Sequence, residues 1–163
     1  MASETSKKRS EEYIMVPFHR PLHYRWKLGP LMSRFYKEAK ENKRLTATRC
    51  PKCNELLFEP KIVCGKCKVR AGDELIDIGD KGTVHTYNTL IMRFWNGWTG
   101  NFHDDPHPVA CIKLDSGVYL EHCLEETDFE KLKQGMRVQA VWKPDGERGG
   151  GASDILYFRT IEE

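Results

Sequence analysis

The sequence predicts a mainly β protein in which a helical N-terminal arm leads into a four-cysteine ribbon and then into a five-stranded barrel. Three observations predict this architecture. Two C-x-x-C pairs stand close together, a segment of helical periodicity precedes them, and segments with the two-residue period of strands follow them. We therefore divide the chain into an arm and amphipathic helix at 1–44, a ribbon at 45–77 and a barrel domain at 78–163.

The composition is that of an ordinary globular protein. The 163 residues are 39% hydrophobic and 31% charged, which suits one compact domain or two small ones. No apolar run approaches the roughly 18 residues that are needed to span a bilayer. The first nine residues are polar and charged, and no apolar stretch of a secretory signal follows them. From these features we expect a cytoplasmic protein.

The charges are divided unevenly along the chain. Residues 1–70 hold 17 Lys and Arg against 7 Asp and Glu, whereas residues 71–163 hold 9 against 17. The basic half could face phosphates, nucleic acid or an acidic partner. A basic helix and tail surrounded by solvent would give the same pattern, so charge alone does not decide among these interpretations.

The first 44 residues contain one segment with a clear helical signal. Residues 31–43 place Phe35 and Ala39 on one face and lysines on the other, and Pro30 fits the first turn of a helix. Before it, residues 13–30 alternate prolines with aromatic side chains, which disfavours a continuous helix. We predict that this stretch is an extended arm that lies on this protein's own surface or on a partner's.

After the cysteines, five segments are rich in β-branched and aromatic residues, as strands are. They cover residues 82–94, 107–115, 118–125, 136–142 and 155–161. An Asp-Ser-Gly turn at 115–117 joins the second strand to the third, and a capping box at 127–130 opens a short helix that Gly135 ends. The glycine-rich segment 143–154 is predicted to be a mobile loop.

The order of these elements is that of an OB-fold. A short helix between the third and fourth of five strands is typical of this partly open barrel, and the segment has a suitable length. Alternation along the second strand places Ala110, Ile112 and Leu114 on one face, as a half-buried strand requires. A five-stranded sandwich would show the same alternation and is the alternative architecture.

The two cysteine pairs form a metal-binding pattern. Ten residues separate the pair Cys50 and Cys53 from the pair Cys64 and Cys67, and each turn can direct two sulfurs at one ion. Four thiolates complete a tetrahedron and leave no position for water, so we predict one structural Zn²⁺ and no metal-based catalysis. A rubredoxin-like iron site is the alternative. We expect Gly65 to relieve crowding in the second turn.

The other reactive residues do not form a catalytic constellation. Cys111 and Cys123 lie singly in predicted strands, where packing explains them better than catalysis does. His103 and His107 flank two aspartates in a loop, which makes a second metal site conceivable, although a loop that contacts solvent or a partner fits better. The sequence contains no nucleophile elbow, P-loop or dinucleotide-binding motif. We therefore predict no catalytic residue in this chain.

Large aromatic side chains form a second kind of candidate site. The segment 93–102 combines four of them with arginine, glycine and asparagine where a barrel loop is expected. Aromatics beside arginine are typical of interface hot spots. The partner-interface candidates are these four and two residues of the arm, namely Tyr24, Trp26, Phe94, Trp95, Trp98 and Phe102. The alternative is that the loop folds back and plugs the mouth of the barrel.

Taken together, the motifs resemble those of a known family. They are Phe35-Tyr36, Arg49-Cys50-Pro51-Lys52-Cys53, Phe58-Glu59-Pro60, Cys64-Gly65-Lys66-Cys67, the glycine-led strand 82–87, Pro108-Val109-Ala110-Cys111-Ile112 and the segment 132–138. This combination, spread over residues 31–161, is similar to the zinc-ribbon/OB-fold proteins catalogued as domain of unknown function thirty-five (DUF35).

The resemblance implies a function. Members of this family usually accompany thiolases or thiolase-like enzymes that act on acyl-CoA, as scaffolds or required small subunits, while the catalytic groups lie in the partner. This chain would then be a non-catalytic subunit of a hetero-oligomeric acyl-CoA thiolase complex, with a coenzyme A thioester at the complex interface. Within this family, the chain resembles members that serve anaerobic toluene degradation. Segments 13–30 and 93–107 depart from the common pattern and would be added partner surface.

Two other functions fit part of the sequence. Zinc ribbons and OB-folds also occur in nucleic-acid-binding proteins, where aromatic side chains stack on bases in a basic groove. The excess of acidic residues in the barrel half has the wrong sign for a groove that follows phosphates. An independent enzyme with a second metal between His103 and His107 is the remaining alternative, and a content of one zinc per chain would count against it.

Overall fold

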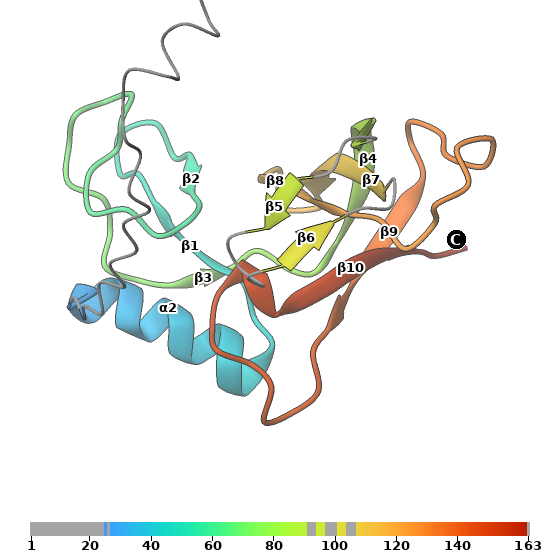
Figure 1. Ribbon diagram of the computed structural model, residues 1–163. Helices are drawn as coiled ribbons and strands as arrows, with labels where there is room; N and C mark the ends of the chain where they lie inside the picture. The colour runs from blue at the N-terminus through green and yellow to red at the C-terminus, as the bar shows by residue number, and fades with distance from the viewer. Residues whose placement is uncertain (1–24, 26, 91–93, 97–100, 104–106, 163) are drawn as a thin grey trace, which may run out of the picture.

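The computed structural model of the protein (Figure 1) describes residues 25, 27–90, 94–96, 101–103 and 107–162. The arm candidates Tyr24 and Trp26 and the loop candidate Trp98 lie outside the described residues. Along the chain, one helix is followed by three short ribbon strands and then by the barrel strands. Within the described part, no helix is long and apolar enough to cross a membrane.

The predicted helix forms as α2, Gly29–Asn42. Pro30 lies in its first turn, where a missing amide hydrogen breaks no helical hydrogen bond, and Lys43 ends the helix in a left-handed conformation with φ of 53°. Phe35 is fully buried on the face that the periodicity predicts. Its ring packs edge-on against that of Phe58 in the ribbon, with 6.1 Å between the centroids. This contact fixes the helix to the ribbon.

The ribbon is a three-stranded antiparallel sheet. Its strands are β1 (Thr46–Arg49), β2 (Leu56–Leu57) and β3 (Ile76–Asp77), in the order β2-β1-β3. The central strand β1 therefore pairs on both sides, with Thr48 opposite Leu57. In Figure 1 the ribbon and α2 form one end of the molecule and the barrel forms the other.

The barrel domain is a five-stranded antiparallel sheet with OB-fold connections. Its strands are β4 (Lys81–Leu90), β7 (His107–Leu114), β8 (Tyr119–Cys123), β9 (Arg137–Trp142) and β10 (Ile155–Thr160). The order is β10-β9-β4-β7-β8, and Leu124 forms a parallel bridge to Phe158 between the two edge strands. The Glu125 amide also donates to the Phe158 carbonyl at 2.9 Å. The sheet thus curls round and meets itself along a short seam, as in a partly open barrel.

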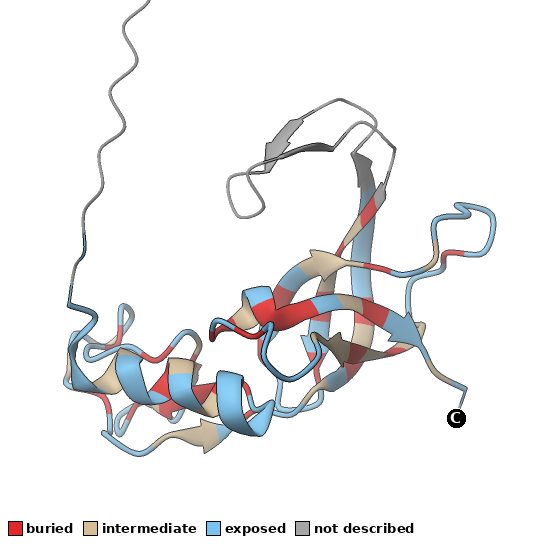
Figure 2. Ribbon diagram, turned by 60° about the horizontal axis from the view of Figure 1, so that its bottom comes forward, coloured by how far each residue is buried: buried red, intermediate tan, exposed pale blue. Residues whose placement is uncertain are grey.

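One hydrophobic core joins the ribbon to the barrel. Leu45 and Ala47, at the start of the ribbon, and Ile78, just after it, are buried in the same cluster as the inward-facing barrel side chains. In β7, Ile112 and Leu114 are at most 1% exposed, on the face that the alternation predicts. In Figure 2 the buried residues, drawn in red, run through the barrel strands and recur on the helix.

Gly82 allows β4 to pass close to β7. A Cβ atom at this position would lie 2.5 Å from the carbonyl oxygen of Lys113, which is closer than real side chains approach backbone atoms. A few residues later the pairing register shifts between Val84 and Thr86. This β-bulge lets the strand bend around the barrel.

The prediction of a short helix after residue 127 is wrong. Between β8 and β9 the chain makes two overlapping turns, in which the Lys131 amide donates to the Asp128 carbonyl at 3.1 Å and the Leu132 amide closes the second turn at 3.3 Å. So few residues cannot offset the cost of helix nucleation. Leu132 is only 4% exposed, because the turns direct it into the core.

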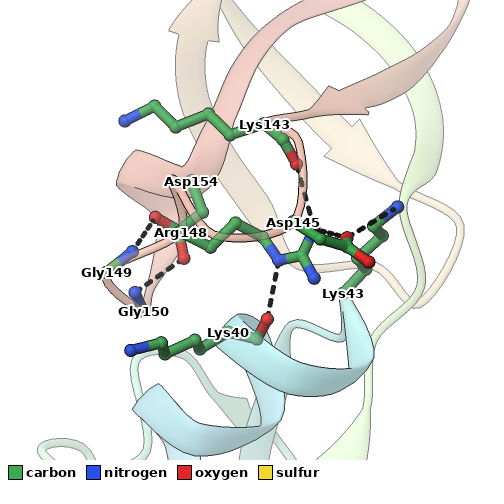
Figure 3. A network of polar contacts seen from close by, with 8 residues as sticks. All are labelled: Lys40, Lys43, Lys143, Asp145, Arg148, Gly149, Gly150 and Asp154. Atoms are coloured by element: carbon green, nitrogen blue, oxygen red, sulfur yellow. Dashed lines mark hydrogen bonds and ion pairs between the residues drawn. The ribbon is translucent and has the colours of Figure 1, made fainter.

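The glycine-rich segment 143–154 folds around one buried carboxylate (Figure 3). Asp154 is 1% exposed and accepts hydrogen bonds from the amides of Gly149 and Gly150 at 2.9 and 2.6 Å. The segment closes in a 3₁₀ turn, η1 (Ala152–Asp154). The prediction of a mobile loop is therefore wrong, because the sequence pattern marks the glycines but not the carboxylate that orders them.

Arg148 ties the same segment to α2 (Figure 3). Its Nε donates to the carbonyl of Lys40 at 2.6 Å, and Nη1 donates to the Lys143 carbonyl at 3.0 Å and to the Asp145 carboxylate at 2.6 Å. Lys40 lies in the last turn of the helix, where carbonyl groups lack helical partners and a cation complements the helix dipole. The helix is thereby attached to the barrel domain as well as to the ribbon.

Candidate metal centre

The two C-x-x-C turns have the same backbone geometry. In the first, the Asn54 amide donates to the Cys50 carbonyl at 2.9 Å, and the Cys50 amide donates to the Glu55 carbonyl at 3.0 Å. In the second, the Lys68 amide donates to the Cys64 carbonyl at 2.9 Å, and the Cys64 amide donates to the Val69 carbonyl at 3.0 Å. Asn54 and Lys68 both have positive φ, at 61° and 57°. The ribbon thus contains two copies of one turn.

In the second turn, Gly65 is not the residue whose backbone conformation is restricted. A Cβ atom at Gly65 would meet no heavy atom within 4 Å, and Gly65 is not in the left-handed region. The expectation that Gly65 relieves crowding is therefore wrong, and Pro51 takes the corresponding place in the first turn. The left-handed position belongs to Lys68 instead.

The four sulfur atoms converge at one point between the turns. Those of Cys50, Cys53, Cys64 and Cys67 lie within 4.8 Å of one another, and the Cys53 and Cys64 sulfurs are 3.9 Å apart. A tetrahedral zinc site with Zn–S bonds of about 2.3 Å has edges of about 3.8 Å. The spacing therefore fits zinc. Cys50 and Cys64 are fully buried, whereas the other two are partly exposed.

Backbone amides point at two of the sulfurs. The Cys53 amide donates to the Cys50 sulfur and the Cys67 amide to the Cys64 sulfur, both at 3.5 Å. The first of these bonds lowers the pKa of Cys50 to about 7. The pKa of Cys67 is raised to about 12, chiefly by its hydrogen bond with Cys53 and then by burial. Thiols in this arrangement do not all ionise unaided, and a bound divalent ion would release the remaining protons.

A cleft of about 500 Å³ lies between the first cysteine turn and the β7–β8 hairpin. Its lining combines charged, polar and apolar residues, namely Arg49, Asn54, Glu55, Leu56, Phe58, Ser116, Gly117, Val118 and Tyr119. This cleft could not be predicted from the sequence, because its walls come from two segments far apart in the chain and no local pattern signals their contact. Arg49 donates to the Asn54 carbonyl at 3.0 Å, so its guanidinium group is held on the ribbon side.

Three of the aromatic candidates lie in a short hairpin. Phe94 and Trp95 belong to β5 (Phe94–Asn96) and Phe102 belongs to β6 (Asn101–His103). The two strands are antiparallel, with Trp95 opposite Phe102. The backbone therefore brings these three positions together. The other three candidates lie outside the described residues, and both alternatives for this segment stay predictions.

The remaining reactive side chains do not extend the site. Burial raises the pKa of the Cys111 and Cys123 thiols, so neither favours the thiolate that a nucleophile needs. His122 accepts a hydrogen bond from the Cys123 amide at 3.0 Å, and burial lowers its pKa. In the part of the chain that the structure describes, the four cysteines are the one cluster of metal-ligating groups. The alternative site at His103 and His107 involves side chains outside that part.

Two family matches cover both parts of this fold. Residues 37–71 match the family described as "ChsH2, rubredoxin-like zinc ribbon domain", and residues 76–143 match "ChsH2, C-terminal OB-fold domain". Fold and cysteine geometry together define a zinc-ribbon/OB-fold protein. A "DUF35 domain-containing scaffold protein" of Pyrococcus furiosus is 30% identical over 110 residues, which are 68% of this chain and 76% of that relative. The chain belongs to the DUF35 family.

Other similar proteins agree with this assignment. DUF35 domain-containing scaffold proteins of Methanothermobacter thermautotrophicus and Methanocaldococcus jannaschii are 25% and 28% identical, over 71% and 73% of this chain and 84% of each relative. A solved structure described as "Ltp2-ChsH2(DUF35) aldolase" has a TM-score of 0.55 at 23% identity, covering 86% of this chain and 98% of that one. A DUF35 protein from Sulfolobus solfataricus has a TM-score of 0.53 at 18% identity, covering 82% and 87%. These two structures support the fold alone.

Proposed function

We propose that this chain is a non-catalytic subunit of an acyl-CoA thiolase complex, in which it supports a separate catalytic subunit. The observation that carries the proposal is the four-cysteine centre. An ion held by four protein thiolates has no open position at which to bind or activate a substrate. Its contribution is to fold the ribbon, which buries little apolar surface by itself.

The metal in this proposal is one structural Zn²⁺ per chain, with Cys50, Cys53, Cys64 and Cys67 as its ligands. The sulfur spacing and the rubredoxin-like zinc ribbon match support zinc. When bound, the ion supplies four metal–sulfur bonds that hold the two turns together. The two amide–sulfur hydrogen bonds, at 3.5 Å each, orient the buried pair of sulfurs toward it.

The relatives support a scaffolding role. Three curated relatives are described as scaffold proteins, and a structure of the same fold is described as an Ltp2-ChsH2(DUF35) aldolase. We infer from them that this chain forms a hetero-oligomer with a catalytic partner. A thiolase is the partner class that the sequence resemblance implies, and a coenzyme A thioester would then lie at the interface between the subunits.

Finer features of the proposal concern the interface and the pathway. The aromatic residues Tyr24, Trp26, Phe94, Trp95, Trp98 and Phe102 would contact the partner. The chain would be organised as an arm and helix at 1–44, a ribbon at 45–77 and a barrel at 78–163. The narrowest candidate identity is the small subunit of benzoylsuccinyl-CoA thiolase, which acts in toluene-type aromatic degradation in the cytoplasm.

The test is to tag the chain in its native host, purify it gently and identify what accompanies it. We expect a thiolase-like chain in near-stoichiometric amount, and no thiolase activity in the isolated protein. Activity of the isolated chain would contradict the proposal. Recovery of nucleic acid, together with salt-sensitive binding to single-stranded oligonucleotides, would favour the nucleic-acid-binding alternative.

A further inference from the structure

The second arm of the ribbon, residues 61–70, is strongly basic. Its sequence KIVCGKCKVR holds four cations and no Asp or Glu. The exposed cations are Lys61, Lys66, Lys68 and Arg70. Arg70 pairs with Asp73 at 3.1 Å. Among the residues that the structure describes, no carboxylate lies within ion-pair distance of the three lysines, so their charges face solvent.

Two aliphatic side chains stand exposed on the same arm. Ile62 is 59% exposed and Val63 is 50% exposed, and Ile62 is the most exposed large hydrophobic side chain in the described part of the chain. One exposed aliphatic residue needs no explanation, but two in succession on a small basic surface suit an interface with an apolar centre and a charged rim.

Hydrogen bonds hold the backbone of the arm in place on the ribbon. The Thr48 hydroxyl donates to the Lys61 carbonyl at 3.0 Å and accepts from the Lys61 amide at 3.1 Å. The Ala71 amide donates to the Ile62 carbonyl at 2.8 Å, and a β-bridge joins the two sides of the arm. A partner that docks on this arm would lose little affinity to conformational ordering.

Two arginines of the barrel are arranged differently. Arg137 binds the Asp115 carboxylate with two nitrogens at 2.6 and 2.9 Å, and Arg159 binds the Glu125 carboxylate with two nitrogens at 2.7 Å each. These barrel cations have carboxylate partners within the same chain. The three arm lysines have none among the described residues, which leaves their charges available to the thiolates of the metal centre or to another molecule.

We propose that the arm 61–70 is the surface on which the catalytic partner subunit docks, through an acidic patch with an apolar centre. This inference rests on the proposed function. Neutralising the metal thiolates would account for the lysines but not for exposed Ile62 and Val63, which carry no charge. A single-stranded nucleic acid would use aromatic platforms for its bases, and the arm has none. An acidic protein surface with an apolar pocket accounts for both features.

Charge reversal tests the docking surface. The arm variant combines Lys61→Glu, Lys66→Glu and Lys68→Glu. The control variant makes the same change at three exposed barrel lysines, Lys81, Lys113 and Lys133, so both variants alter the net charge equally. Binding to the purified catalytic subunit that accompanies the tagged wild-type chain is measured by calorimetry at low and high salt. The zinc content of every variant is measured alongside.

We expect the arm variant to bind about 10- to 100-fold more weakly than wild type, and the control to change less than about 3-fold. Added salt should weaken wild-type binding but strengthen binding of the arm variant, because salt screens the repulsion between its glutamates and the acidic patch. A wild-type chain that binds no catalytic subunit contradicts the proposed function itself. A wild-type chain that binds, with both variants equally tight, overturns only the docking surface.

A second measurement leaves the lysines and the metal centre unchanged. A photo-crosslinking amino acid is placed at Ile62 and, in a separate control protein, at Leu156, which is 44% exposed on β10. Cross-links to the catalytic subunit are expected from Ile62 and not from Leu156. The reverse pattern, or cross-links from Ile62 to nucleic acid alone, would overturn the proposal even if the arm variant lost its zinc.

Discussion

At Asn54 and Lys68 the cysteine turns close in the left-handed conformation, with φ near 60°. Asparagine adopts this conformation readily, because its short polar side chain can hydrogen-bond locally, whereas lysine gains nothing there and pays roughly 1–2 kcal/mol. Structural zinc binds zinc-finger peptides with about 10–16 kcal/mol at neutral pH. A metal-held turn can therefore contain a lysine where an unsupported turn would favour glycine.

Replacing Cys64 with serine removes a fully buried sulfur from the proposed zinc site. We expect the zinc content to fall well below one ion per chain and the ribbon to lose structure, since metal binding supplies much of the folding free energy of such a module. Elemental analysis and NMR of the ribbon amides measure both effects. Cys111→Ser, which changes a half-buried thiol on β7, is the matched control and should retain zinc. Equal zinc contents would contradict the assigned ligands.

His122 makes folding stability depend on pH. Burial lowers its pKa in the folded state, whereas the ring in the unfolded chain takes up a proton near pH 6.5. The stability from the neutral ring is therefore complete above about pH 6.5 and is lost as pH falls through the folded-state pKa. Urea unfolding of His122→Gln should show a smaller loss between about pH 7 and pH 5 than wild type shows. Parallel pH curves for the two proteins would assign the loss to other groups.

At the scale of elements, the segment 143–154 approaches α2 so closely that Gly150 has no room for a side chain. A Cβ atom there would lie 2.7 Å from Tyr36 Cδ1 and 2.8 Å from the Tyr36 carbonyl oxygen, and φ is 110°. Gly146 has a comparable φ of 93°, with open space around it. We expect Gly150→Ala to reduce the free energy of unfolding by about 2–4 kcal/mol and Gly146→Ala by about 1 kcal/mol.

Urea unfolding of the two alanine variants measures this difference directly. Gly146→Ala carries the backbone strain of a positive φ without the steric contact, so it isolates the cost of the clash with the helix. Similar losses in both variants would show that the segment does not pack on α2 as described.

Elements with a local signal could be predicted from the sequence. The helix follows from the spacing of Phe35 and Ala39, although it begins at Gly29 rather than at residue 31. Alternation correctly identifies the buried face of β7, and the Asp-Ser-Gly turn after it forms the hairpin with β8. The C-x-x-C spacing likewise predicts that four sulfurs converge, because each short turn holds its own pair.

Features that depend on distant contacts could not be predicted. The capping box at 127–130 is a real local motif, but the chain has too few residues there to propagate a helix. Arg148 reaches the carbonyl of Lys40, 108 residues away in sequence, and Asp154 orders glycines that suggest mobility when read alone. The cleft beside the first cysteine turn arises only when the ribbon meets the β7–β8 hairpin.

At the scale of the whole molecule, the shared core makes the ribbon and barrel depend on each other. Leu45, Ala47 and Ile78 contribute to the same buried cluster as the barrel strands. We expect the chain to unfold in one transition, and removal of zinc by a chelator to lower the barrel's melting temperature as well, because the metal binds the folded state. NMR signals from β1 and β9 during heating measure the two parts separately. A barrel that melts unchanged after chelation would show that the two parts fold independently.

The two edges of β10 are held very differently, because the seam with β8 is much shorter than the pairing with β9. Strand β10 pairs with β9 at five positions, whereas its other edge is held by the bridge from Leu124 to Phe158, the bond from the Glu125 amide and the ion pair of Arg159 with Glu125. Mechanically, the barrel is a cylinder with a slit along its length, and the two edges of the slit are joined over only a short stretch. Its softest breathing motion is a widening of that slit, which breaks few hydrogen bonds and leaves the remaining wall intact. The seam is thus the part of the wall that opens most easily, and the buried ring of Phe158, which is 1% exposed, lies directly behind it.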